Sequence, residues 1–209
     1  MYINNPMEIE NKSMDIIEEG LNKTNFTEEE KIVVKRTIHT TGDLDYQNIV
    51  DFKEDFVNVA KNSLKNKVKI YTDTNMTKAG VNKKAMEKLG LEIVCYIADE
   101  DVAKKAKEEG TTRSQAAIEK AIKEGVTCFS IGNAPTALYK LLEEYDAGRA
   151  KIDFVIGVPV GFVGAAESKE DLRGYKIPQV TTIGNKGGSN VAASIINALM
   201  YMLVERWKN

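Results

Sequence analysis

The first third of the chain carries apolar residues at the spacing of amphipathic helices. Residues 7–21 have this rhythm, and a second such stretch covers residues 52–64. Between them, the segment Thr27-Glu-Glu-Glu30 has the composition of a capping box, in which the threonine accepts a backbone N–H and the last glutamate reaches back. This box predicts a helix that starts there, and Gly42 permits a sharp exit from it. We therefore expect the chain to open with helices.

After residue 66 the pattern changes to short, nearly continuous apolar runs separated by helical segments. Such runs are typical of strands in a sheet that is covered on both faces. They predict five strands, at residues 68–72, 91–97, 126–131, 152–158 and 179–183. The remaining segments predict helices at residues 82–89, 99–109, 112–124, 135–145, 167–172 and 189–207. The last helix, with Ser189 as its cap, is apolar on most faces, so we expect it to be buried in the core or against another subunit.

Strands that alternate with helices indicate βαβ units with right-handed crossovers. The predicted fold class is α/β: an open, mostly parallel five-stranded sheet with helices on both faces, preceded by an N-terminal helical segment. No repeat, low-complexity stretch or linker interrupts the chain. We expect one domain over residues 1–209, with a helical part at 1–66 and a βα-repeat core at 67–209.

Composition and charge exclude several classes of partner. The chain has 209 residues, of which 43% are hydrophobic and 29% charged, as in ordinary soluble proteins. A formal net charge of -2 argues against a broad basic surface, so nucleic acid is not expected as a partner. No apolar run approaches the roughly 20 residues that cross a bilayer, and residues 1–10 lack the regions of a signal peptide. No membrane association is expected.

Cysteine and histidine usage bounds the compartment and the metal chemistry. Cys95 and Cys128 are the only cysteines, and each lies in a predicted strand. We expect free packing thiols in a reducing cytoplasm. One histidine and two separated cysteines cannot form a structural zinc site. A carboxylate site for Mg²⁺ or Ca²⁺ stays open, although no EF-hand spacing occurs.

The segment Arg36-Thr-Ile-His-Thr-Thr-Gly-Asp43 holds His39, the only histidine in the protein. Histidine changes its charge near neutral pH, so His39 is the candidate for proton transfer. It falls near the predicted helix C-terminus, where the helix dipole favours the imidazolium form. Arg36 lies three residues earlier, on the same helical face. The alternative is a histidine that packs at a helix end and bonds a carbonyl group.

Glycine and small polar residues follow four of the five predicted strands, at residues 73–80, 132–136, 157–164 and 184–189. The carboxyl ends of parallel strands form the ligand-binding edge of an open α/β sheet. Glycine lets a ligand approach the backbone, and helix N-termini offer N–H donors to anions. Loops between strands and helices need glycine anyway, but four such loops favour a large, anionic, partly flat ligand.

Common ligand motifs do not occur in these loops. No G-x-G-x-x-G follows a strand, residues 184–189 lack the P-loop order, and no Ser-His-Asp set with a nucleophile elbow occurs. The segment His39-Thr-Thr-Gly42 resembles half of the motif with which some corrinoid proteins bind cobalt, but Thr37 stands where an aspartate is expected. Arg113 starts a predicted helix, where a cation is disfavoured. This indicates an anion nearby, although a surface arginine is the simpler explanation.

Five segments of the chain occur in the same order in a known family. They are Arg36-Thr-Ile-His-Thr-Thr-Gly-Asp43, Thr72-Asp-Thr-Asn-Met-Thr-Lys-Ala-Gly80, Gly132-Asn-Ala-Pro-Thr-Ala-Leu138, Gly157-Val-Pro-Val-Gly-Phe-Val-Gly-Ala-Ala-Glu-Ser-Lys169 and Gly187-Gly-Ser189. On these segments the chain resembles the precorrin-8X methylmutase family. The resemblance runs from about Ser13 to the C-terminal helix, nearly the whole chain.

The resemblance implies an isomerase of cobalamin biosynthesis, which moves a methyl group of a corrin precursor from ring carbon 11 to ring carbon 12. The product is hydrogenobyrinate, or cobyrinate when cobalt is already inserted. The family's catalytic histidine falls on His39, as proton donor or acceptor, and its substrate-contacting serine and arginine fall on Ser13 and Arg36. The threonines after His39 resemble the cobalt-dependent branch of the family. The family is homodimeric, with active sites close to the subunit interface.

The resemblance also implies a substrate fringed with carboxylates and no cofactor or metal held by the protein, because cobalt, where present, belongs to the substrate. Arg36, Arg113 and Lys186 can supply positive charge, and Phe162 and Met76 can pack against the ring. The substrate contacts expected on the loops are Asp73, Thr74, Met76, Arg113, Asn133, Thr136, Gly161, Phe162, Lys186, Gly188 and Ser189. Two other functions stay open: a non-catalytic tetrapyrrole carrier, and an α/β enzyme that uses a nucleotide.

Overall fold

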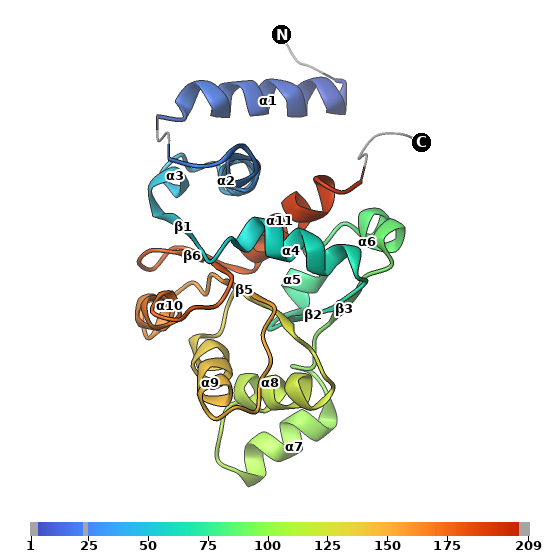
Figure 1. The fold of residues 1–209 in the computed structure, drawn as a ribbon, viewed down its shortest axis with the longest axis vertical. Coiled ribbons are helices and arrows are strands. Elements are labelled where there is room, and N and C mark those ends of the chain that lie inside the picture. Colours follow the sequence, from blue (N-terminus) through green and yellow to red (C-terminus); the bar gives the residue numbers. More distant parts are fainter. Residues whose placement is uncertain (1–3, 23–24, 205–209) are drawn as a thin grey trace.

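The computed structural model of the chain describes residues 4–22 and 25–204 (Figure 1). Its strands are β1 Val50–Lys53, β2 Lys69–Thr72, β3 Glu92–Val94, β4 Cys128–Ile131, β5 Phe154–Gly157 and β6 Gln179–Thr182. Within the described residues these six strands form one sheet in the order β1-β6-β5-β4-β2-β3. The edge strand β1 is antiparallel to β6, and the other neighbouring pairs are parallel. The predicted α/β class and mostly parallel sheet are confirmed, but the sheet has six strands, not five.

Helices cover both faces of this sheet (Figure 1). They are α1 Pro6–Gly20, α2 Glu28–Thr41, α3 Tyr46–Ile49, α4 Phe56–Lys65, α5 Asn75–Gly80, α6 Lys83–Leu89, α7 Glu100–Glu108, α8 Arg113–Lys123, α9 Pro135–Asp146, α10 Ala165–Arg173 and α11 Ser189–Tyr201. Helices α2, α4, α6 and α11 enclose one hydrophobic core, and α7 to α10 enclose a second one on the opposite face. Side chains of the central strands alternate between the two: Cys128 and Phe154 enter the first core, and Phe129 and Val155 enter the second.

The strand β1 is one of the elements that the sequence prediction missed, together with the short helices α3 and α5. The prediction placed residues 52–64 in one helix, but Phe52 lies in β1 and α4 begins at Phe56. Between them Glu54 and Asp55 have φ angles of 52° and 53°, a left-handed conformation that is uncommon for residues other than glycine. The two phenylalanines have the i, i+4 spacing of a helix, yet they meet across this turn with ring centroids 6.2 Å apart. Their spacing therefore indicated a continuous helix that the backbone interrupts.

The predicted start and end of helix α2 agree with the structure. Thr27 caps α2 in a complete capping box, in which its hydroxyl accepts from the Glu30 N–H at 3.2 Å and its own N–H donates to the Glu30 carboxylate at 2.8 Å. Gly42 ends this helix in the left-handed conformation, with φ of 66°. The prediction of both ends of α2 is confirmed.

Several boundaries differ from the prediction. The expected strand at 91–97 is reduced to β3, so Cys95 lies beyond its end and is half-buried, whereas Cys128 is buried in β4. The expected loop at 73–80 contains α5. Gly188, not Ser189, takes the cap position of α11, which ends at Tyr201. The predicted continuation to Trp207 lies partly outside the described residues.

Helix α11 is buried in the core, one of the two predicted locations for an apolar last helix. It packs against α2, α4, α5 and α6, and its buried residues include Val191, Ile195 and Leu199. Because α11 starts at the carboxyl edge of the sheet, its burial fixes the loop that leads into it. The core therefore positions one wall of the candidate site.

Candidate active site

Loops from four strands meet at the edge of the sheet where the parallel strands end. The hydroxyl groups of Thr74 and Ser189 lie 2.8 Å apart, which joins the segment after β2 to the start of α11. Two hydrogen bonds join the loop after β5 to the loop after β6. The Gly188 N–H donates to the Val158 carbonyl at 2.9 Å, and the Gly161 N–H donates to the Asn185 carbonyl at 3.2 Å. The prediction that these segments share one edge is confirmed.

The backbones of these loops are packed against one another without room for side chains. A Cβ atom placed on Gly187 would lie 2.2 Å from the Val158 carbonyl oxygen, closer than real Cβ atoms come. A Cβ atom on Gly132 would lie 2.9 Å from the Gly188 carbonyl oxygen. Glycine is therefore required here for close approach of one loop to the next.

Asp73 holds the loop after β4. Its carboxylate accepts the backbone N–H groups of Gly132, Asn133 and Ala134 at 2.9, 2.8 and 2.7 Å. The side chain is 1% exposed, and burial raises its pKa while the three N–H donors oppose the rise. Both carboxylate oxygens are thus engaged by the protein's own backbone, so Asp73 contributes to the site by fixing this loop. In this loop the predicted substrate contact Asn133 is exposed. Thr136, at the start of α9, is half-buried.

Thr74 and Ser189 have structural partners of their own. The Thr74 hydroxyl caps α5 by accepting the Thr77 N–H at 3.1 Å, and it lies 3.0 Å from the Thr77 hydroxyl. Ser189 is the first residue of α11, and its bond to Thr74 replaces the capping role that we expected of it. The pair therefore connects two loops of the edge.

His39 lies in the last turn of α2 and is exposed. The predicted position near a helix C-terminus is confirmed. The turn that follows is bound to the loop after β6, because the Lys186 ammonium lies 2.6 Å from the Asp43 carboxylate and 3.0 Å from that of Asp45. These bonds raise the pKa of Lys186 to about 12 and lower that of Asp43. The helix end that carries His39 is thus tied to the carboxyl edge of the sheet.

Arg36 lies in α2, on the helical face that also carries His39, and Ser13 lies in α1, which packs against α2 (Figure 1). The Arg36 guanidinium binds the Glu10 carboxylate of α1 at 2.8 Å and lies 5.4 Å from the centroid of the Tyr201 ring. The Ser13 hydroxyl donates to the Ile9 carbonyl within α1 at 2.8 Å. Sequence reasoning did not identify Glu10, because no local pattern pairs residues that lie 26 positions apart.

A small pocket lies beside Arg36. It has a volume of about 170 Å³ and is lined by Met14, Ile32, Lys35, Arg36, Ala198 and Tyr201. Ligand sites commonly measure about 300–1,000 Å³, so this pocket is too small for a macrocycle. A macrocyclic ligand of Arg36 must therefore extend over the open surface, or α1 must move.

Large apolar side chains are exposed in the segments that follow β2 and β5. Phe162 is 92% exposed, Val163 90% and Met76 70%. The first two lie between Gly161 and Gly164, whose φ angles of 150° and 76° are conformations that favour glycine. Solvent exposure of such side chains is unfavourable.

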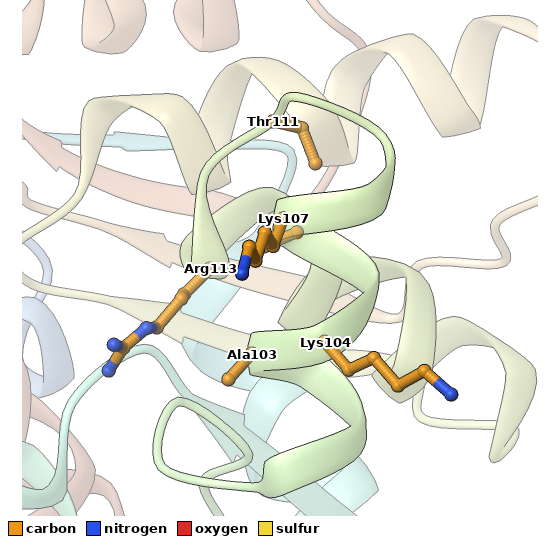
Figure 2. A pocket seen from close by; sticks show the side chains of 6 residues that line it. Ala103, Lys104, Lys107, Thr111 and Arg113 are labelled. Carbon is orange, nitrogen blue, oxygen red and sulfur yellow. The ribbon is translucent and has the colours of Figure 1, made fainter.

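Arg113 lies away from His39, at the start of α8 on the opposite face of the sheet (Figure 1). The prediction that it starts a helix is confirmed. An open pocket of about 600 Å³ between α7 and α8 is lined by Ala103, Lys104, Ala106, Lys107, Thr111 and Arg113. Figure 2 shows the Arg113 and Lys104 side chains extending in different directions, with Lys107 on the Arg113 side. A 3.3 Å hydrogen bond from Thr112 to Thr136 links this helix start to α9.

Other kinds of site receive no support from the described residues. No group of three or more His, Cys, Asp or Glu among them is arranged to hold a metal ion. In the same part of the chain no helix is both long and apolar enough to span a bilayer. Cys95 and Cys128 are both free thiols.

The fold and the glycine-rich edge define an α/β protein with a mostly parallel sheet, a class in which ligands commonly bind at the carboxyl ends of the strands. The sequence profile of the precorrin-8X methylmutase family matches residues 8–202. A cobalt-precorrin-8 methylmutase of Salmonella typhimurium is 44% identical, with 98% of this chain and 99% of the relative covered. One of Priestia megaterium is 42% identical, with 93% and 87% covered. The crystal structure of precorrin-8x methyl mutase from Thermus thermophilus matches with a TM-score of 0.87 and 32% identity, covering 94% and 95% of the two chains.

The chain belongs to the precorrin-8X methylmutase family. It is therefore an enzyme of the isomerase class.

Proposed function

We propose that this chain moves a methyl group from ring carbon 11 to ring carbon 12 of cobalt-precorrin-8 or precorrin-8X in cobalamin biosynthesis. The product is cobyrinate, or hydrogenobyrinate when cobalt is absent. The observation that carries the proposal is the 44% identity to a cobalt-precorrin-8 methylmutase over nearly the full length of both chains. The glycine-lined edge, with His39 on a helix end bound to it, supports the same reaction.

In this proposal His39 is the proton donor or acceptor to the macrocycle. The rearrangement breaks one carbon–methyl bond and forms another within the same molecule, so it needs no leaving-group acceptor, oxidant or reductant. We propose that the protein supplies no cofactor and that any cobalt belongs to the substrate. Protonation of the ring changes its electron distribution, and one well-placed acid or base contributes about 10²–10⁴-fold to the rate. Binding the substrate in a reactive shape supplies the remainder.

The proposed substrate carries several carboxylates around a flat ring. Arg36, Arg113 and Lys186 are the cations proposed to bind them, since guanidinium and ammonium groups pair with carboxylates. Arg36 and Lys186 already pair with carboxylates of the protein, so substrate carboxylates must compete with these. Phe162 and Met76 are exposed apolar groups suited to the ring face. Asn133, Thr136, Gly161, Gly188, Ser189 and Thr74 are proposed to line the remaining edge, with Asp73 behind them and Ser13 on α1.

We further propose that the enzyme works as a homodimer in the cytoplasm. Exposed Phe162 and Val163 at the site edge support a second subunit that covers them. The arrangement of Arg113 on the opposite face from His39 also fits a site completed between two chains. The two free thiols fit a reducing compartment.

The deciding experiment uses purified protein and cobalt-precorrin-8, followed by absorption spectroscopy. We expect repeated turnover to the product chromophore. A shift that stops at one equivalent per protein would instead identify a tetrapyrrole carrier, and thermal stabilisation by nucleotides but not corrinoids would identify a nucleotide enzyme.

The role of His39 is tested by His39→Ala. We expect turnover to fall by about 10²–10⁴-fold, with product affinity and melting temperature nearly unchanged, because the side chain is exposed. The matched control is Lys84→Ala, at an exposed position of α6, which should keep full turnover. Normal turnover in a folded His39→Ala protein would refute the assigned role.

A further inference from the structure

Lys169 is a buried lysine directly beneath the loop that leads into α11. It belongs to α10, and the residue is only 1% exposed. Its ammonium donates to the Lys186 carbonyl at 2.8 Å and to the Thr182 hydroxyl at 3.1 Å. Among the described residues it has no carboxylate partner, and burial lowers its pKa to about 8. Burial of a cation without a carboxylate partner lowers stability, so stability alone does not explain the presence of this lysine.

Satisfying the Lys186 carbonyl is not a sufficient reason. The Thr182 hydroxyl already donates to that carbonyl at 2.6 Å. A threonine and an apolar neighbour would meet the hydrogen-bonding need of this peptide group without burying a charge. What the lysine adds is a second, charged donor that fixes the peptide plane of residue 186 in one orientation.

The fixed peptide connects the loop to the helix end that carries His39. The Lys186 side chain leaves the same residue and binds Asp43 and Asp45 at 2.6 and 3.0 Å. Asp43 follows directly after Gly42, the cap residue of α2. A continuous chain of polar contacts therefore runs from the Lys169 ammonium through residue 186 to the turn after His39.

We propose that Lys169 is a positioning residue that holds His39 in one orientation over the carboxyl edge of the sheet by anchoring the Lys186 peptide. This inference rests on the proposed proton-transfer role of His39. Without the anchor, the loop and the acidic turn bound to it sample several positions. A displacement of about 1 Å at a catalytic group can reduce a rate by around 100-fold.

The test compares Lys169→Met with a control, Lys176→Met, which makes the same replacement at an exposed lysine shortly after α10. Methionine fills the lysine stem's volume and removes an unpaired buried cation, so the variant should fold. We expect kcat of Lys169→Met to fall between about tenfold and 100-fold, with a smaller change in KM, and the control to behave as wild type.

A spectroscopic measurement on the free protein tests the positioning independently of turnover. His39 is the only histidine, so the ¹H–¹³C cross peak of its Cε1–H group is assigned without ambiguity. We expect one sharp peak in wild type and a broadened or doubled peak in Lys169→Met. A wild-type protein without turnover would refute the proposed function and leave this readout valid.

A second variant removes the contact between the Lys186 side chain and the acidic turn after His39. Asp43→Asn combined with Asp45→Asn removes the charges that bind Lys186 and leaves the buried lysine in place. We expect the same loss of kcat and the same change in the His39 peak, and combination with Lys169→Met should add little because the contacts act in series. Unchanged kcat and an unchanged sharp peak in either folded variant, with or without lost stability, would overturn the proposal.

Discussion

Gly187 offers the sharpest test of the packed loops at the site edge. Its Cβ position lies 2.2 Å from the Val158 carbonyl oxygen and 2.9 Å from the carbonyl carbon of the same residue. Its φ is outside the left-handed region that favours glycine, so alanine at this position meets a steric obstacle and no conformational one. In Gly187→Ala the contact must open from 2.2 Å to at least 3.0 Å by moving one backbone away from the other.

The magnitude follows from two contributions. Overpacking of a close contact costs about 1–3 kcal/mol. The movement also strains the neighbouring bond from the Gly188 N–H to the Val158 carbonyl, now 2.9 Å long, whose loss costs about 0.5–1.5 kcal/mol. We therefore expect Gly187→Ala to lower the free energy of unfolding by about 1.5–4.5 kcal/mol, measured by denaturant titration at equilibrium.

The matched control is Gly148→Ala, two residues after the end of α9. Gly148 has a φ of 71°, and nothing lies within 4 Å of its Cβ position, so alanine there costs only the left-handed conformation, about 1–2 kcal/mol. Gly187→Ala should in addition weaken product binding, because its loop leads directly into Ser189 at the start of α11, whereas Gly148→Ala should not. Equal stability loss in the two variants, or unchanged product affinity in Gly187→Ala, would refute the reasoning about close backbone approach.

Three further predictions concern charge, exposure and pH. Glu10→Gln frees Arg36 from its carboxylate partner. The product dissociation constant, measured by calorimetric titration, should then fall by up to about fivefold, the equivalent of roughly 1 kcal/mol for a partly exposed ion pair. A rise in this dissociation constant would show instead that Glu10 orients the arginine. Phe162→Ser should leave the melting temperature unchanged, since the ring is exposed in the single chain. It should weaken dimerisation in sedimentation experiments or product binding in titrations. No change in either would refute the proposal that a second subunit or the substrate covers this ring. The hydrogen bond from a neighbouring arginine lowers the pKa of Glu144 from 4.5 to about 2, so its stabilising contribution is complete above about pH 4.5 and lost as the pH falls towards 2. Glu144→Gln should therefore flatten the acid limb of the stability curve, and an unaltered limb would contradict this origin.

Much of the fold could be predicted because its signals are local. The strands β4 and β5 are buried on both faces, so they appear in the sequence as continuous apolar runs. The start and end of α2 follow from a capping box and a glycine. The strand β1 could not be predicted in this way, because the turn after it uses Glu54 and Asp55 in a conformation that glycine usually marks. Its place in the sheet is set by pairing with β6, which is remote in sequence.

The candidate site also contains features with local sequence signals, which could be predicted, and long-range contacts, which could not. His39 could be chosen as a candidate because it is unique and lies in a recognisable segment, and the glycine loops could be placed at one edge because they follow strands. The contacts that organise them are long-range: Lys186 binds Asp43 across 143 positions, and Glu10 binds Arg36 across 26. Lys169 resembles any helix lysine in the sequence, and only tertiary packing shows that it is buried. Asp73 was correctly placed at the edge, but its engagement by backbone N–H groups depends on the conformation of another loop.

The separation of the two hydrophobic cores by the sheet has a consequence for engineering this enzyme. Helix α2, which carries His39, packs in the first core through Val34, whereas α8, which begins at Arg113, packs in the second through Ile118. Substitutions at distant sites that share no partners have additive effects on stability. Substitutions that repack the core beneath α2 should therefore change stability independently of substitutions in the core beneath α8.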